Sequence, residues 1–85
     1  KHRVLIADDE THFARRLGGY MADHGFEVRF VTSVSEAKDV VQTWLPDSIF
    51  INLFLPETNA LSLFKFVNSR PLRVVPRIIV MSKQA

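Results

Sequence analysis

Four short runs of apolar residues alternate along this chain with longer stretches in which apolar residues recur every three or four positions. The runs predict strands at Val4–Ala7, Phe26–Thr32, Ser48–Leu53 and Arg77–Met81. Nearly unbroken apolar runs are typical of parallel strands that are covered on both faces. The stretches between them have the period of amphipathic helices. Strands separated by helices predict βαβ units and a parallel sheet in an α/β domain.

The second strand differs from the others because Phe26, Val28 and Phe30 alternate with Glu27 and Arg29. Such alternation places the apolar residues on one face and the charged residues on the other. We therefore predict that this strand lies at an exposed edge of the sheet, where charged side chains discourage pairing with other chains.

The first predicted helix spans Thr11–His24 and contains two glycines, Gly18 and Gly19, each of which costs about 1 kcal/mol relative to alanine. It therefore needs support from the rest of the fold. Gly25 follows as a left-handed cap. The inner stripe of this helix is predicted to comprise Phe13, Ala14, Leu17, Tyr20 and Met21.

The second predicted helix begins at a capping box, in which Ser33 caps the helix and Glu36 returns a hydrogen bond. It ends before Pro46 and carries Trp44 on its apolar stripe, so this tryptophan is predicted to lie in the core.

The third predicted helix spans Asn59–Asn68. Its inner face is predicted to comprise Ala60, Leu63, Phe64 and Val67. Phe50, Phe54 and Phe66 are also assigned mainly to the core. Phe66 falls off the inner stripe, so an exposed contact residue is the alternative for it.

Length and composition indicate one small globular domain spanning residues 1–85. The chain contains no cysteine, so the apolar core must stabilise it without a disulfide or a zinc–thiolate site. The net charge is +2, but the arginines are scattered among acids, which argues against a nucleic-acid groove. No apolar stretch is long enough for a membrane span and no signal peptide opens the chain, so we expect a cytoplasmic protein.

Polar residues that could take part in chemistry lie at the carboxyl ends of three of the four predicted strands. Asp8 and Asp9 follow the first, Asn52 lies near the end of the third, and Ser82 follows the fourth. The carboxyl ends of parallel strands meet at one edge of a sheet, where ligands of open α/β folds bind. Neighbouring carboxylates attract magnesium, which prefers oxygen ligands and retains water. A plainer interpretation of Asp8-Asp9-Glu10 is a solvated helix N-terminus.

The spacing of these features resembles the response-regulator receiver domain. The resemblance rests on Val4–Glu10, on Pro46-Asp47 before the third strand, on Leu53–Pro56 after it, and on Ile78–Ser82. It implies a flavodoxin-like α/β fold, a three-layer sandwich whose parallel sheet has the strand order 2-1-3-4. Relative to the family pattern, the chain stops before the fifth strand, so we expect an incomplete receiver-like domain.

The same resemblance implies a role for each site residue. In receivers an aspartate at the position of Asn52 accepts a phosphoryl group. The second acid of the pair, here Asp9, binds magnesium directly, and the first, Asp8, acts through water. The backbone carbonyl at the position of Phe54 completes the protein ligands, and the hydroxyl at Ser82 hydrogen-bonds the phosphoryl oxygens.

Three departures from the family pattern bear on activity. Asn52 replaces the acceptor aspartate, and a neutral amide is a poor nucleophile. Asn59-Ala60 replaces the usual Asp-Gly pair, and Lys83 replaces the small residue that follows the hydroxyl. Lys83 is either a surface lysine or a positive charge that offsets the two acids. The resemblance therefore implies a degenerate receiver, or pseudo-receiver, that is not an enzyme.

The expected function is that of a signalling module that binds a protein partner or itself. We expect no cofactor apart from weak magnesium binding through Asp9, Asn52 and the backbone carbonyl of Phe54. We also expect a homodimer through the edge of the fourth strand, which has no fifth strand beside it. Two alternatives remain open: a phosphorylatable receiver with an unusual acceptor, such as Asp9 or Ser82, and the N-terminal regulatory part of a DNA-binding response regulator.

Overall fold

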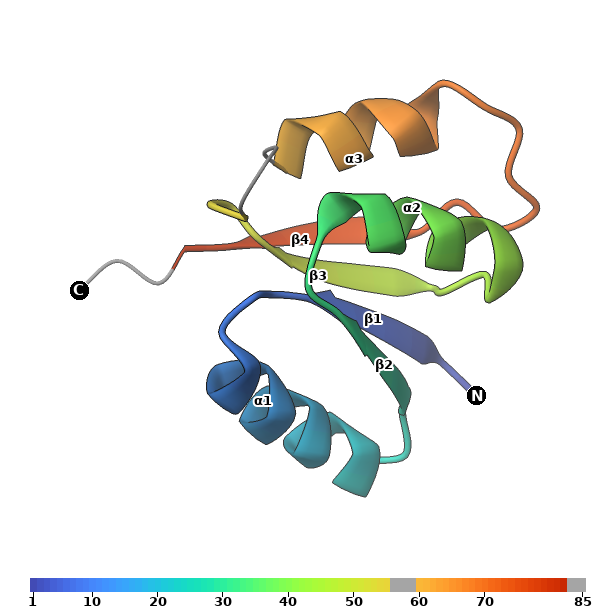
Figure 1. Ribbon diagram of the computed structural model, residues 1–85. Coiled ribbons are helices and arrows are strands. Elements are labelled where there is room, and N and C mark those ends of the chain that lie inside the picture. The colour runs from blue at the N-terminus through green and yellow to red at the C-terminus, as the bar shows by residue number, and fades with distance from the viewer. Residues whose placement is uncertain (56–59, 83–85) are drawn as a thin grey trace.

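The computed structural model describes residues 1–55 and 60–82. Strands and helices alternate from the N-terminus (Figure 1). Their bounds are β1 Arg3–Ala7, α1 Thr11–Asp23, β2 Glu27–Val31, α2 Val34–Thr43, β3 Ser48–Asn52, α3 Ala60–Asn68 and β4 Arg77–Met81. Each strand lies within two residues of its predicted bounds, and the third ends at Asn52 itself.

The four strands form one parallel sheet in the order β2-β1-β3-β4. One face of the sheet carries α1 and the other carries α2 and α3, which gives three layers (Figure 1). The flavodoxin-like class and the 2-1-3-4 order predicted above are thereby confirmed. So is the edge position of β2, which pairs with β1.

The core consists of two clusters, one on each face of the sheet, because alternate residues of a strand point in opposite directions. On the α1 side, Val4 and Ile6 of β1 pack with Ala14. On the other side, the larger cluster joins β1 and β3 to α2 and α3. It contains Trp44, which is 9% exposed, so its predicted core position is confirmed.

The first turn of α2 confirms half of the predicted capping box. The hydroxyl of Ser33 accepts from the backbone N–H of Glu36 at 3.2 Å. The carboxylate of Glu36, however, accepts from the backbone N–H of Thr32 at 2.9 Å and from the Thr32 hydroxyl at 3.1 Å. The return bonds therefore go chiefly to the residue before the cap, with weaker ones to Ser33 itself, and they tie the end of β2 to the start of α2.

The prediction that Phe64 lies on the inner face of α3 is wrong, whereas the assignment of Phe66 mainly to the core agrees with the structure. Phe64 is 52% exposed, whereas Phe66 is half-buried against the larger core cluster. The guanidinium carbon of Arg70 lies 4.0 Å and the ammonium nitrogen of Lys38 lies 5.5 Å from the centre of the Phe66 ring. A ring that contacts two cations is stabilised by cation–π attraction. Contact with α2 therefore covers Phe66, although this residue lies off the predicted apolar stripe of α3.

Two further aromatic residues assigned to the inside are exposed. Tyr20 of α1 is 64% exposed, and its ring lies 4.3 Å from that of His24. The buried position on this part of the helix is Gly18. Phe54, in the turn after β3, is 62% exposed. Phe50 is half-buried and packs against the α1-side cluster.

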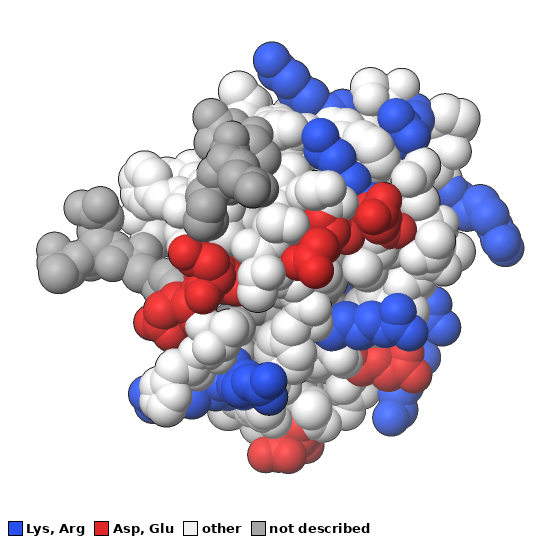
Figure 2. Space-filling view, in the orientation of Figure 1, with Lys and Arg blue, Asp and Glu red and all other residues white. Residues whose placement is uncertain are grey.

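The surface carries mixed charge. Figure 2 shows lysine and arginine side chains interspersed with acids on the face that it presents. Within residues 1–55 and 60–82, no helix has the length and apolar character that a membrane crossing requires.

Candidate functional site

The register of the sheet brings the predicted site residues together at the carboxyl ends of β1 and β3. Ala7 pairs with Ile51, so the next residues, Asp8 and Asn52, leave adjacent strands side by side. Asp8 is 1% exposed and Asn52 is 7% exposed. Asp9 lies on the outside of the loop and is exposed.

The amide of Asn52 links both acids to β3. Its nitrogen Nδ2 donates to Oδ1 of Asp8 at 3.2 Å and to Oδ1 of Asp9 at 3.4 Å. Its oxygen Oδ1 accepts from the backbone N–H of Phe54 at 3.1 Å. A backbone N–H can only donate and an ionised carboxylate can only accept, so the partners on both sides determine which way the amide faces.

Further hydrogen bonds hold the acidic loop in place. The backbone N–H of Asp8 donates to the carbonyl of Val31 on β2 at 3.0 Å. Oδ1 of Asp8 also accepts from the backbone N–H of Glu10 at 3.0 Å. The carboxylate of Glu10 accepts from the backbone N–H of Phe13 at 2.6 Å and caps α1. The interpretation of these acids as a helix N-terminus is thus confirmed for Glu10, which is the N-cap of α1.

Of the remaining predicted residues, the structure describes Ser82 but not Asn59 or Lys83. Ser82 is exposed and directly follows Met81, the register partner of Asn52. The backbone N–H of Leu53 donates to the carbonyl of Met81 at 2.8 Å, which joins the two strand ends. The hydroxyl role of Ser82 stays a prediction. The predictions for Asn59 and Lys83 lie outside the described residues.

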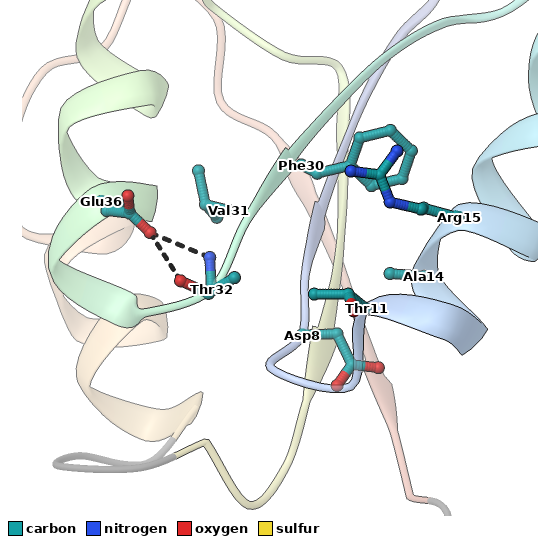
Figure 3. Close-up of a pocket in the computed structure, with 8 residues that line it drawn as sticks. All are labelled: Asp8, Thr11, Ala14, Arg15, Phe30, Val31, Thr32 and Glu36. Carbon is teal, nitrogen blue, oxygen red and sulfur yellow. Dashed lines mark hydrogen bonds between the residues drawn. The ribbon is translucent and has the colours of Figure 1, made fainter.

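A cavity of about 170 Å³ lies on the other side of Asp8, between the carboxyl ends of β1 and β2. Figure 3 shows Glu36 bonded to Thr32 across it from Asp8 and Thr11. The cavity is lined by Asp8, Thr11, Ala14, Arg15, Phe30, Val31, Thr32 and Glu36. This cavity was not predicted from the sequence. The rule that ligands bind at the carboxyl ends of strands would have pointed to Thr32, which directly follows β2.

The carboxylate of Glu36, in the wall of this cavity, accepts two hydrogen bonds from Thr32. The backbone N–H and then the hydroxyl of Thr32 hold the pKa of Glu36 below its ordinary value of 4.5, because both bonds favour the ionised carboxylate. Glu36 therefore stays charged at neutral pH.

The observed donor set at the acidic pair does not fit the magnesium ion that the resemblance implies. The N–H groups of Asn52 face both carboxylates, and its oxygen is bound to the backbone of Phe54. A cation needs oxygen lone pairs in the place where these hydrogens lie. Ligation by Asp9, Asn52 and the Phe54 carbonyl stays a prediction, and it requires the amide to turn over.

Comparison with known proteins identifies relatives along most of the chain. The family model described as "Response regulator receiver domain" matches residues 4–85. The acid tolerance regulatory protein ActR of Rhizobium meliloti (strain 1021) is 34% identical over 79 residues, which are 93% of this chain and 40% of that protein. The transcriptional regulatory protein DltR of Streptococcus agalactiae serotype III is 27% identical over 81 residues, which are 95% and 36% of the two chains. The chain thus spans well under half the length of these relatives.

Solved structures of other response regulator proteins have the same fold as this chain. A CheY-like response regulator receiver domain from Methylobacillus flagellatus superposes with a TM-score of 0.89 at 26% identity, covering 98% of this chain and 70% of that one. A response regulator from Burkholderia pseudomallei, solved with a phosphorylated aspartic acid, a calcium ion and citrate, has a TM-score of 0.84 at 26% identity, covering 100% and 49%. The sheet order, the acidic loop beside the end of β3 and the family match lead to one conclusion: this chain belongs to the response regulator receiver domain family.

Proposed function

We propose that this receiver domain is a pseudo-receiver, a non-enzymatic signalling module that binds protein without being phosphorylated on aspartate. The observation that carries the proposal is the neutral side chain of Asn52 at the end of β3, bonded to Asp8 and Asp9. The similar protein from Burkholderia pseudomallei has a phosphorylated aspartic acid. In this proposal, Asn52 occupies the position at which receivers carry the acceptor aspartate.

The amide of Asn52 differs from an aspartate carboxylate in its ability to attack a phosphodonor. Phosphoryl transfer needs an oxygen nucleophile in line with the leaving group. An ionised carboxylate supplies one, but the lone pair of an amide nitrogen is delocalised and the amide oxygen carries no full charge. The amide oxygen of Asn52 is also engaged by the backbone of Phe54. The side chain thus lacks both the charge and the freedom to attack a phosphodonor.

The test is intact-mass spectrometry after incubation with acetyl phosphate and magnesium. A phosphorylatable receiver treated in parallel should gain the mass of one phosphoryl group, and this chain should gain none. Stable or hydroxylamine-sensitive phosphorylation of the unmodified protein would refute the proposal.

Two variants identify the acceptor if a mass increase does occur. Asp9 and Ser82 are both exposed, so both are accessible to a phosphodonor. Loss of the phosphoryl group in Asp9→Asn or in Ser82→Ala would establish the alternative of a receiver with an unusual acceptor.

The names of the relatives support a role in gene regulation for a longer protein. DltR is named a transcriptional regulatory protein, and this chain matches about a third of it. A DNA-binding effector linked to this domain is therefore the second candidate, and a cytoplasmic location agrees with it. Sequencing the gene beyond the codon for Ala85 tests it, because the effector would have to be encoded there.

The proposed partner of the domain is a second copy, bound through the edge of β4. In the described part of the chain, β4 pairs with β3 and is the last strand of the sheet. The register places Ile79 beside Phe50, and both are half-buried. Val80 is 51% exposed on the opposite face of the strand. An apolar strand whose outer edge is unpaired within residues 1–55 and 60–82 is a template for another strand.

Sedimentation of two matched variants tests this dimer. Val80→Lys places a charge on the edge strand, whereas Val75→Lys places one on a valine before the strand that is 65% exposed. The original chain and Val75→Lys should sediment as dimers and Val80→Lys as a folded monomer. A folded monomer of the original chain at high micromolar concentration would refute the proposal.

A further inference from the structure

We infer that the carboxamide of Asn52 takes the place of a divalent cation between Asp8 and Asp9, so that the folded domain is indifferent to magnesium. Two carboxylates on one short loop repel each other unless a positive or proton-donating group lies between them. The Asn52 nitrogen is 3.2 Å from Oδ1 of Asp8 and 3.4 Å from Oδ1 of Asp9. A single amide group therefore contacts both carboxylates.

The burial of Asp8 and Asn52 holds the amide beside the acids. Asp8 and Asn52 are almost completely buried, and both are continuous with paired strands of the sheet. The amide oxygen is bound to the backbone N–H of Phe54 at 3.1 Å, which keeps the nitrogen turned toward the acids. Hydrogen bonds to charged acceptors are stronger than those between neutral groups.

A cation could enter only by reversing this arrangement. The amide would have to rotate by half a turn, which breaks its bonds to Asp8, Asp9 and the Phe54 backbone together. The cation would gain a neutral oxygen, whereas the affinity of such sites rises with the number of charged ligands. Replacing the amide contacts with a bound cation is therefore unfavourable, because hydrogen bonds are lost and the cation gains only a neutral ligand. The inference does not depend on whether any residue is phosphorylated.

The test compares magnesium responses of the original chain and of Asn52→Asp, with Gln42→Glu as the control. Gln42 is exposed on α2, so its variant adds the same charge away from the acids. Thermal unfolding and backbone NMR spectra are recorded with magnesium chloride and with sodium chloride of equal ionic strength. The original chain and Gln42→Glu should unfold at the same temperature in both salts, without saturable shifts in the amides of residues 8–10.

Asn52→Asp should behave oppositely, because it brings three carboxylates together. Its unfolding temperature should be lower without magnesium and should recover when magnesium is added. Its affinity for the ion should be about tenfold or more above that of the original chain, because a charged ligand replaces the amide. If this variant does not fold without magnesium, adding Asp9→Asn should restore folding, since one negative charge is removed.

Two results would overturn the inference. One is a saturable magnesium response of the original chain at micromolar to low millimolar concentration. The other is an Asn52→Asp variant as stable as the original chain in sodium chloride and unresponsive to magnesium. Either result leaves the phosphodonor experiment unaffected, so failure of this inference and failure of the proposed function can be told apart.

Discussion

Gly18 of α1 lies directly against the ring of Phe30 at the end of β2. A β-carbon at position 18 would come within 2.4 Å of Cζ and 2.6 Å of Cε1 of that ring. The neighbouring Gly19 has nothing within 4 Å of such a carbon. The two glycines therefore have different roles, although they are adjacent in the sequence. The first permits contact between α1 and β2, and the second only weakens the helix.

Alanine substitutions separate these roles. Gly19→Ala should raise the free energy of unfolding by roughly 0.5–1 kcal/mol, because alanine is the better helix former. Gly18→Ala should be less stable than Gly19→Ala by about 1–3 kcal/mol, because the ring must leave its position on the helix. Urea unfolding measures both. In the background of Phe30→Ala most of the difference between the two alanine variants should disappear, and only a small remainder is expected from Val28, whose Cγ1 would lie 3.2 Å from such a carbon. An undiminished difference would contradict the role of Phe30.

Glu36 should make the stability of the domain depend on pH in acid. Its pKa in the folded state is lowered, chiefly by the backbone N–H of Thr32 and then by the Thr32 hydroxyl. The unfolded chain therefore takes up this proton at higher pH than the folded protein does. The resulting stabilisation is fully present above the ordinary pKa of 4.5 and is lost as the pH falls through the lowered folded-state pKa.

The measurement is the difference in unfolding free energy between the original chain and Glu36→Gln. The contributions of all other acids are common to both chains and cancel. The difference should be larger at pH 7 than near pH 3, and a difference that is the same at both pH values would contradict the assignment.

The orientation of α3 predicts opposite outcomes for two neighbouring residues. Leu63 is completely buried in the larger cluster, whereas Phe64 is 52% exposed. Leu63→Ala should lower the free energy of unfolding by about 2–5 kcal/mol, because it leaves a cavity. Phe64→Ala should change the free energy of unfolding by less than about 1 kcal/mol, apart from the difference in helix propensity, because the position is exposed. Comparable losses for both variants would mean that a further surface covers Phe64.

Asp47 should be important for stability although it lies outside both clusters. Its carboxylate accepts from the backbone N–H of Arg3 at 2.8 Å, and its own backbone bonds to both Arg3 and Arg77. It thus joins the starts of β1, β3 and β4. Asp47→Ala should cost about 1–3 kcal/mol, because a partly buried N–H loses its acceptor. Asp39→Ala, at an exposed position of α2, is the control and should cost much less. Equal losses in chemical denaturation would contradict this role.

The order of the strands and the meeting of Asp8 with Asn52 could be predicted from the sequence. Unbroken apolar runs, helical spacing between them and the handedness of βαβ units are local or topological rules that do not need side-chain contacts. A parallel sheet necessarily brings the carboxyl ends of neighbouring strands together. The resemblance to receivers then assigned the strand order, which the register of β1 and β3 confirms.

Only the tertiary structure decided how individual side chains are used. Phe66 is covered instead of Phe64 because Phe66 packs against the larger cluster and its ring contacts Lys38 of α2 and Arg70, and no periodicity contains that information. Glu36 bonds to Thr32 because the end of β2 lies within its reach. The amide of Asn52 faces the acids because the Phe54 N–H takes its oxygen. Each choice depends on where a second element lies in space, whereas the pattern of apolar positions determines only that the element forms.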